Sequence, residues 1–209
     1  VHFLRVASDG TILTADWELS AGDASGARPS VVWRSREFSV AYVESGGLYV
    51  AAIDPTGSMV LDRSTVTTTG GGAPALSRPG GFGVAWAAPP DYRVRLAVRD
   101  ATGRSFGTIV DLPSVGTATG VDLVRAGTEL GVSYQALSAR DVGTHLIRVG
   151  IDGRLRWVSG SSAIALGYAP YGTTALAHDG RRYAVAFTEG TSGAESVMFR
   201  LAGCPGAPP

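Results

Sequence analysis

The chain has 209 residues, of which 44% are hydrophobic and 17% charged, with 29 glycines and 11 prolines. Its length suits one domain, and its composition is too apolar for a disordered chain and too rich in turn-forming residues for a helical bundle. The 18 basic and 18 acidic residues give a formal net charge of zero. No overall field therefore attracts nucleic acid or an anionic membrane surface.

No run of residues approaches the roughly 20 apolar positions of a membrane helix. The chain opens directly on a strand-like segment, Val1-His2-Phe3-Leu4, so no leader is expected in it, and an exported protein would already have lost one. The single cysteine, Cys204, cannot form an internal disulfide. It is expected to be a free thiol or half of a bridge to a segment outside this chain.

Two strands are predicted first, Val1–Ser8 and Thr11–Leu19, joined by a tight Asp9-Gly10 turn. A short pattern of alternating large and small residues that ends in an aromatic then recurs four times, at residues 38–42, 82–86, 130–134 and 183–187. Such a pattern is typical of a strand with both faces packed.

Each of these segments has a predicted strand before it, across a turn. These preceding strands are residues 29–34, 73–78, 121–125 and 174–178. A third strand follows each segment, and most third strands end in an aspartate turn such as Asp54-Pro55-Thr56-Gly57 or Asp152-Gly153. Fourth strands are predicted at residues 59–66, 106–112 and 155–159.

Four antiparallel strands that repeat about every 40–50 residues predict an all-β fold, a β-propeller of four or five four-stranded blades. The predicted units are residues 29–66, 73–112, 119–159 and 172–201 in one domain of residues 1–203, with a tail at 204–209. A β-sandwich is the main alternative, and the fixed strand order favours the propeller. Either Thr11–Leu19 closes the last blade beside Val197–Leu201, or Val1–Leu19 is the back half of a fifth blade.

By this repeat the chain resembles secreted or surface β-propellers of bacteria. The Trp-Asp and Gly-His pairs of WD40 repeats are missing, and Ser8-Asp9-Gly10-Thr11 matches only part of a sialidase Asp-box. The resemblance therefore implies an architecture and a secreted or cell-surface location, and no functional residue.

A periodic set of cations ends the predicted first strand of each blade: Arg34, Arg78, Arg125 and His178. In a closed propeller such positions form a ring, which would suit an acidic glycan or a carboxylate-bearing partner. The alternative is that these long side chains cover apolar surface at strand ends.

Aromatic and acidic candidates are fewer. Tyr168 and Tyr171, in a predicted long loop, are candidates for stacking on a sugar or a peptide. Asp122 is the one carboxylate on the predicted inner strands, whereas propeller glycosidases need two or three. The three histidines lie in different repeats without metal-ligand spacing, so neither a metal nor another cofactor is expected.

These observations predict a non-enzymatic binding module of an exported bacterial protein, which recognises a glycan or a protein through loops on one propeller face. The alternatives are a structural subunit of a larger surface assembly and a glycoside hydrolase or lyase centred on Asp122. Self-association, or a second chain that completes a blade, is also expected.

Overall fold

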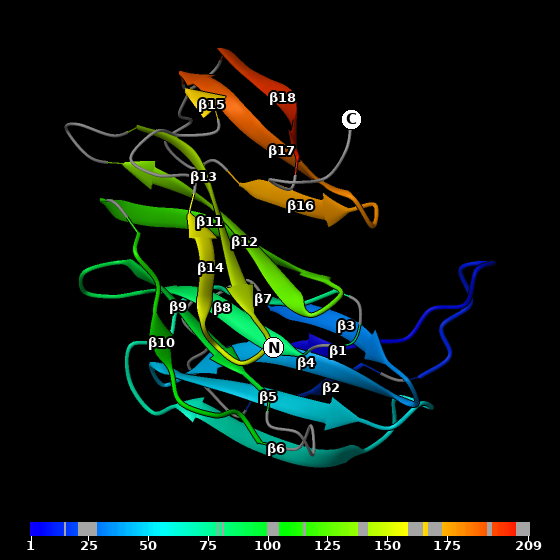
Figure 1. The fold of residues 1–209 in the computed structure, drawn as a ribbon. Coiled ribbons are helices and arrows are strands. Elements are labelled where there is room, and N and C mark those ends of the chain that lie inside the picture. The colour runs from blue at the N-terminus through cyan, green and yellow to red at the C-terminus, as the bar shows by residue number, and fades with distance from the viewer. Residues whose placement is uncertain are drawn as a thin grey trace.

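Antiparallel sheets follow one another along the chain. The computed structural model describes residues 1–14, 16–20, 29–78, 80, 82–99, 105–114, 116–137, 142–158, 165–166, 173–191 and 194–203. Within them, strands β1 to β18 form an N-terminal pair and four larger sheets. Figure 1 shows the first sheet and the fourth sheet at opposite ends of the molecule, with the second and third between them.

The N-terminal pair consists of β1 (His2–Phe3) and β2 (Trp17–Glu18). The first sheet contains β3 (Ser30–Arg34), β4 (Glu37–Glu44), β5 (Gly47–Ile53) and β6 (Val60–Thr67). The second contains β7 (Pro74–Leu76), β8 (Gly83–Ala88), β9 (Arg93–Val98) and β10 (Val110–Asp111).

The third sheet contains β11 (Thr117–Ala126), β12 (Glu129–Leu137), β13 (Val142–Gly150) and β14 (Leu155–Val158), and β15 (Ala165–Leu166) also pairs with β13. The fourth contains β16 (Thr174–His178), β17 (Arg182–Thr191) and β18 (Ala194–Gly203). Apart from β15, the strands lie in chain order within each sheet, and the predicted all-β propeller of antiparallel sheets is confirmed. The fourth sheet differs from the four-stranded prediction in having three strands among the described residues.

The recurring large–small pattern explains how the sheets stack. On β4, Tyr42 points back toward the N-terminal pair, while its neighbour Ala41 points forward and clusters with Trp86 of the second sheet. On β8, Trp86 points back and Ala85 points forward, into the cluster that contains Tyr134 of the third sheet. Successive side chains of a strand point to opposite faces. Each sheet thus places large residues on the small residues of the sheet before it.

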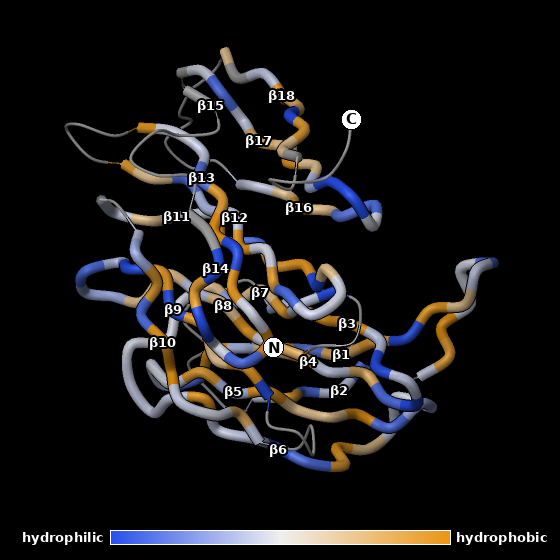
Figure 2. The backbone as a smooth tube through the Cα atoms, in the orientation of Figure 1, coloured by the Kyte–Doolittle hydropathy of each residue, from blue (hydrophilic) through white to orange (hydrophobic). Residues whose placement is uncertain are grey.

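The apolar side chains lie along the strands, and the turns are more polar. Figure 2 shows a hydrophilic turn between β16 and β17, in contrast with the many hydrophobic positions on β4, β5, β7 and β8. Separate buried clusters fill the spaces between successive sheets. The core is therefore a series of inter-sheet layers.

The N-terminal pair does not extend the fourth sheet. β2 pairs with β1, and β18 pairs only with β17 among the described residues. The expectation that Thr11–Leu19 pairs with Val197–Leu201 is therefore wrong. Phe3 and Trp17 instead join the buried cluster of the first sheet that contains Tyr42.

Candidate functional site

The cations expected to form a ring do not occupy one set of equivalent positions. Trp33 pairs with Phe38, the first residue of the recurring pattern on β4. Arg125 and His178 pair in the same way with the first residues of the pattern on β12 and β17. Arg34 lies one residue farther along the chain. The expectation that Arg34 is equivalent to Arg78, Arg125 and His178 is therefore corrected, because Trp33 takes that position in the first sheet.

Three of these cations contact groups close to them in sequence or on the neighbouring sheet. The Arg34 guanidinium pairs with the carboxylate of Glu37 at 3.2 Å. The Arg125 guanidinium lies over the ring of Phe82, 3.7 Å from its centroid, a cation–π contact. The Nδ1 atom of His178 accepts the N–H of the following turn at 3.1 Å. These contacts stabilise strand ends and turns.

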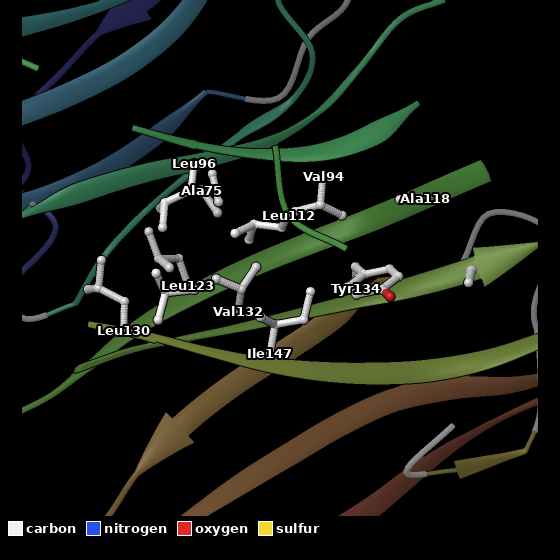
Figure 3. Packing of buried hydrophobic residues seen from close by; sticks show 13 residues of the cluster. Ala75, Val94, Leu96, Leu112, Ala118, Leu123, Leu130, Val132, Tyr134 and Ile147 are labelled. Atoms are coloured by element: carbon white, nitrogen blue, oxygen red, sulfur yellow. The ribbon is translucent and has the colours of Figure 1, made fainter. Parts of the chain in front are cut away.

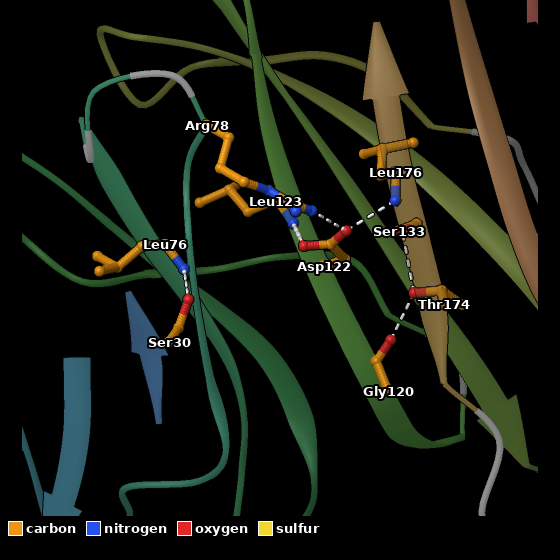
Figure 4. Close-up of polar contacts among 9 residues, drawn as sticks. All are labelled: Ser30, Leu76, Arg78, Gly120, Asp122, Leu123, Ser133, Thr174 and Leu176. Carbon is orange, nitrogen blue, oxygen red and sulfur yellow. Dashed lines mark hydrogen bonds and ion pairs between the residues drawn. The ribbon is translucent and has the colours of Figure 1, made fainter. Parts of the chain in front are cut away.

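Arg78 and Asp122 form a link among three sheets (Figure 4). Arg78 Nη2 donates to Asp122 Oδ2 at 2.8 Å, and the same oxygen accepts the backbone N–H of Leu176 at 2.7 Å. Asp122 Oδ1 accepts the N–H of Leu123 at 2.8 Å. The carboxylate therefore joins the segment that follows β7 to β11 and β16, and three N–H groups already occupy its oxygens.

Equivalent links join the inner strands elsewhere. Ser30 Oγ on β3 accepts the N–H of Leu76 on β7 at 3.0 Å, and Ser30 occupies in the first sheet the position that Asp122 occupies in the third. The carbonyl of Arg78 accepts the N–H of Arg125 at 2.8 Å. Asp122 thus has the geometry of a structural residue. Tyr168 and Tyr171 lie outside the described residues.

A different set of side chains forms a polar interface between the third and fourth sheets. Thr119, Gln135 and Thr144 lie directly opposite one another on β11, β12 and β13, and so share one face of the sheet. Gln135 Nε2 donates to the carbonyl of Thr188 on β17 at 3.0 Å, which shows that this face is turned to the fourth sheet.

The polar interface continues two residues farther along β12. Ser133 Oγ lies 2.9 Å from Thr174 Oγ1 on β16, and the Thr174 hydroxyl also donates to the carbonyl of Gly120 at 2.5 Å. Ser133, Gln135 and Thr144 are completely buried. We use the name polar interface for Thr119, Ser133, Gln135, Thr144 and Thr174, together with the backbone carbonyl of Thr188.

The earlier inter-sheet layers are apolar at the same positions. In place of Ser133, Gln135 and Thr144, the first sheet has Ala41, Val43 and Leu48, and the second has Ala85, Ala87 and Val94. A polar side chain that loses water without gaining a partner costs about 1–3 kcal/mol. Stability therefore does not account for the polar replacements.

Several atoms of the polar interface have no hydrogen-bond partner. Among the described residues, they are the hydroxyl oxygens of Thr119 and Thr144 and Oε1 of Gln135. Buried polar atoms normally have partners, so each exception suggests a bound molecule or a functional role. An amide oxygen only accepts, whereas a threonine hydroxyl donates and accepts. The set matches a ligand that carries several hydroxyl groups.

Sequence reasoning missed the polar interface. The repeat at residues 130–134 was interpreted by what it shares with the other copies. The departures from that pattern, serine at 133 and glutamine at 135, were the available indication.

The aspartate turns behave as turn chemistry predicts. Asp54 accepts hydrogen bonds from the Thr56 hydroxyl and from the backbone N–H groups of Ser58 and Met59, which lower the pKa of its carboxyl to about 2. The N–H of Arg154 similarly lowers the pKa of Asp152. Hydrogen bonds to a carboxylate favour its charged form.

Two further classes of site find no support in the described part of the chain. No group of three or more histidine, cysteine, aspartate or glutamate side chains is close enough there to hold a metal ion. No helix there is long and apolar enough to cross a membrane.

Comparison with known proteins gives a fold and no family. No family model matches the chain, and no curated protein matches its sequence. The hydrazine synthase of Kuenenia stuttgartiensis is similar in structure, with a TM-score of 0.60 and 14% identity over 90% of this chain and 50% of that one.

Two other solved structures match most of this chain. One, from Bacteroides uniformis, is assigned as a 6-phosphogluconolactonase, with a TM-score of 0.54, 12% identity, and coverage of 96% of this chain and 64% of that one. The other is a periplasmic gluconolactonase of Pseudomonas aeruginosa, with a TM-score of 0.53, 14% identity, and coverage of 96% and 63%. The chain thus spans less than two thirds of each neighbour's length.

The comparisons overturn the expectation of a non-enzymatic binding module. Proteins that share this fold over most of the chain bear the names of enzymes, two of them lactonases. The expectation rested on zero net charge and on the absence of paired catalytic groups. Neither property separates a binding propeller from an enzyme of the same fold.

Proposed function

We propose that the protein is a hydrolase of small, hydroxyl-rich sugar derivatives, specifically sugar lactones, which it binds at the polar interface. The observation that carries this proposal is the row of unpartnered oxygens on Thr119, Gln135 and Thr144. The lactonase names of two structural neighbours support the reaction class.

The chemistry of the row fits a polyol. Gln135 Oε1 accepts a substrate hydroxyl, and the threonine hydroxyls donate to or accept from others. Thr119 is half-buried while Gln135 and Thr144 are fully buried, so substrate would approach past Thr119. Neutral partners suit an uncharged sugar ring better than a phosphate or a metal ion.

The reaction is a hydrolysis. The oxygen of water bonds to the lactone carbonyl carbon, and the ring bond between that carbon and oxygen breaks. The leaving ring oxygen takes up a proton, and the product is an open-chain sugar acid. In this proposal Thr119, Gln135 and Thr144 bind and orient the substrate hydroxyls, and positioning of this kind lowers the barrier.

A lactone assay tests the proposal. Purified protein is mixed with glucono-1,5-lactone, and acid release is followed in a pH-stat against the spontaneous rate. We expect hydrolysis above that rate, and a fall of at least tenfold in kcat/KM for Thr144→Val. Thr65→Val makes the same chemical change at an exposed position of β6 and should leave the rate unchanged. Hydrolysis at only the spontaneous rate would overturn the proposal.

We further propose that the protein works outside the cytoplasm. One structural neighbour is a periplasmic enzyme, and an oxidising compartment is compatible with a chain that holds a single cysteine. Cell fractionation of the source bacterium, with an antibody to this chain, tests the location, and a purely cytoplasmic signal would contradict it.

A further inference from the structure

The forward face of the fourth sheet carries exposed apolar side chains where the earlier sheets have buried ones. Phe199 on β18 is 61% exposed. The first three sheets have a residue that pairs with its neighbouring strand in the same way as Phe199 does. These equivalent residues are Val50, Leu96 and Leu146, and they are at most 2% exposed.

The neighbours of Phe199 follow the same rule. Val197 is 78% exposed, while its equivalents Leu48 and Val94 are fully buried. Leu201, two residues beyond Phe199 on the same face, is 53% exposed. Three adjacent apolar side chains on one face indicate an interaction surface.

The rest of this face has the small residues on which a following sheet packs. Ala184 and Ala186 on β17 lie opposite Leu201 and Phe199. The equivalents of Ala186 in the first two sheets, Ala41 and Ala85, cluster with aromatic residues of the next sheet. We call Ala184, Ala186, Thr188, Val197, Phe199 and Leu201 the forward face. None of these six residues is charged, and Arg182 lies at the edge of the same face, two residues before Ala184. The centre of the face therefore suits an apolar partner.

The opposite end of the molecule exposes the complementary kind of surface. Val31 on β3 is 57% exposed, and its equivalents Leu76, Leu123 and Leu176 are at most 3% exposed.

Trp33, two residues from Val31 on β3, is 49% exposed. The N-terminal pair covers Val40 and Tyr42 on β4 and leaves these β3 residues uncovered. We call Val31 and Trp33 the backward face.

We propose that a second copy of this chain docks its backward face on the forward face of the first. The contact would continue the large-on-small packing that joins the sheets within one copy. Each copy offers both halves of the contact, because the exposed Val31 and Trp33 occupy positions that pack on a preceding sheet elsewhere in the chain. Such a contact is heterologous, so it forms a closed ring or an open chain of copies.

The mass in solution tests the proposal. Light scattering with size-exclusion chromatography, between 1 and 200 µM protein, should show mass that rises with concentration. Phe199→Glu should weaken association at least 100-fold. Leu61→Glu, at an exposed apolar position of β6, is the matched control and should leave the mass unchanged.

A mixing experiment identifies the contact. Phe199→Glu damages only the forward face, and Trp33→Glu damages only the backward face. Each variant should be a monomer alone, and the mixture should contain a 1:1 dimer, because one intact face of each kind remains. A monomeric parent chain at 200 µM, or a mixture without dimer, would overturn the proposal. Lactone hydrolysis is measured separately, so failure here does not bear on the proposed activity.

Discussion

The layer between the second and third sheets and the layer between the third and fourth come from the same repeated strands but differ in chemistry. The first layer is built around a buried apolar cluster that contains Leu96, Val132 and Tyr134 (Figure 3). The second layer has an apolar cluster too, but beside it Ser133, Gln135 and Thr144 replace apolar residues. Both layers hold adjacent sheets together, and the second adds a row of polar atoms that have no partner among the described residues.

The difference teaches which part of a repeat protein is free to acquire a function. Departures from the local pattern that weaken packing are expected at functional sites. The apolar layer follows the pattern and serves stability. The polar interface departs from it at three adjacent positions, and the neighbouring sheets supply the stability that the departure costs.

The largest effect is expected in the apolar layer. Leu96→Ala should lower the free energy of unfolding by about 2–5 kcal/mol, because it removes a fully buried side chain and leaves a cavity. Denaturant unfolding followed by tryptophan fluorescence measures the loss. Leu61→Ala on the exposed strand β6 is the control, with a change within about 0.5 kcal/mol. Equal losses for the two variants would contradict the assignment of the layer.

A smaller loss is expected where the layers are tied together at the inner strands. Asp122→Ala should cost about 2–3 kcal/mol, because the N–H groups of Leu123 and Leu176 and the Arg78 guanidinium lose their acceptor. Asp122→Asn keeps one acceptor oxygen and should cost less. A loss below about 0.5 kcal/mol for alanine would show that the link is dispensable.

At the polar interface, removal of a buried hydroxyl group without a partner should raise the stability of the fold. Thr144→Val removes a buried hydroxyl without a partner and keeps the shape of the side chain, so stability should rise by about 1 kcal/mol. Ser133→Ala removes a hydroxyl that is hydrogen-bonded to Thr174, so this variant should lower the stability by a similar amount. Destabilisation by the valine variant would mean that Thr144 serves packing.

The smallest effect concerns an exposed turn outside both layers. Asp54 should titrate near pH 2, and Thr56→Val should move its pKa up toward 3.8, because the Thr56 hydroxyl is the main group that stabilises the charged carboxylate. Because the pKa of Asp54 is lower in the folded chain than in the unfolded chain, its charged carboxylate stabilises the fold at any pH above the unfolded pKa. That contribution is lost as the pH falls from about 4 to about 2. NMR titration of the carboxyl carbon checks both values.

The sheets could be predicted from the sequence because the pattern that defines them is local. The alternation of large and small residues fixes the middle strands, and tight turns such as Asp152-Gly153 fix the hairpins. Short outer strands were less predictable: β10 spans only Val110–Asp111 of the expected 106–112, and β15 was missed. Two-residue strands carry too few alternating positions to be recognised.

The candidate site could not be predicted because it depends on pairing between sheets. Arg34 seemed equivalent to Arg125 by its place at the end of a strand, and only the register shows that Trp33 holds that position. The polar interface brings Thr119 and Thr144 beside Gln135 from three separate strands and sets them against the fourth sheet. Their sequence neighbourhoods give no indication of that meeting.

The order in which the sheets stack has a consequence for how the molecule opens. Each sheet contacts only its neighbours, so stability spreads along the row as in a one-dimensional cooperative lattice. The fourth sheet is covered on one face, whereas the second and third are covered on both. Fraying should therefore begin at β18 and advance inward. Backbone amides there would exchange with solvent faster than those of β8 and β12, which places the polar interface beside the first layer to loosen.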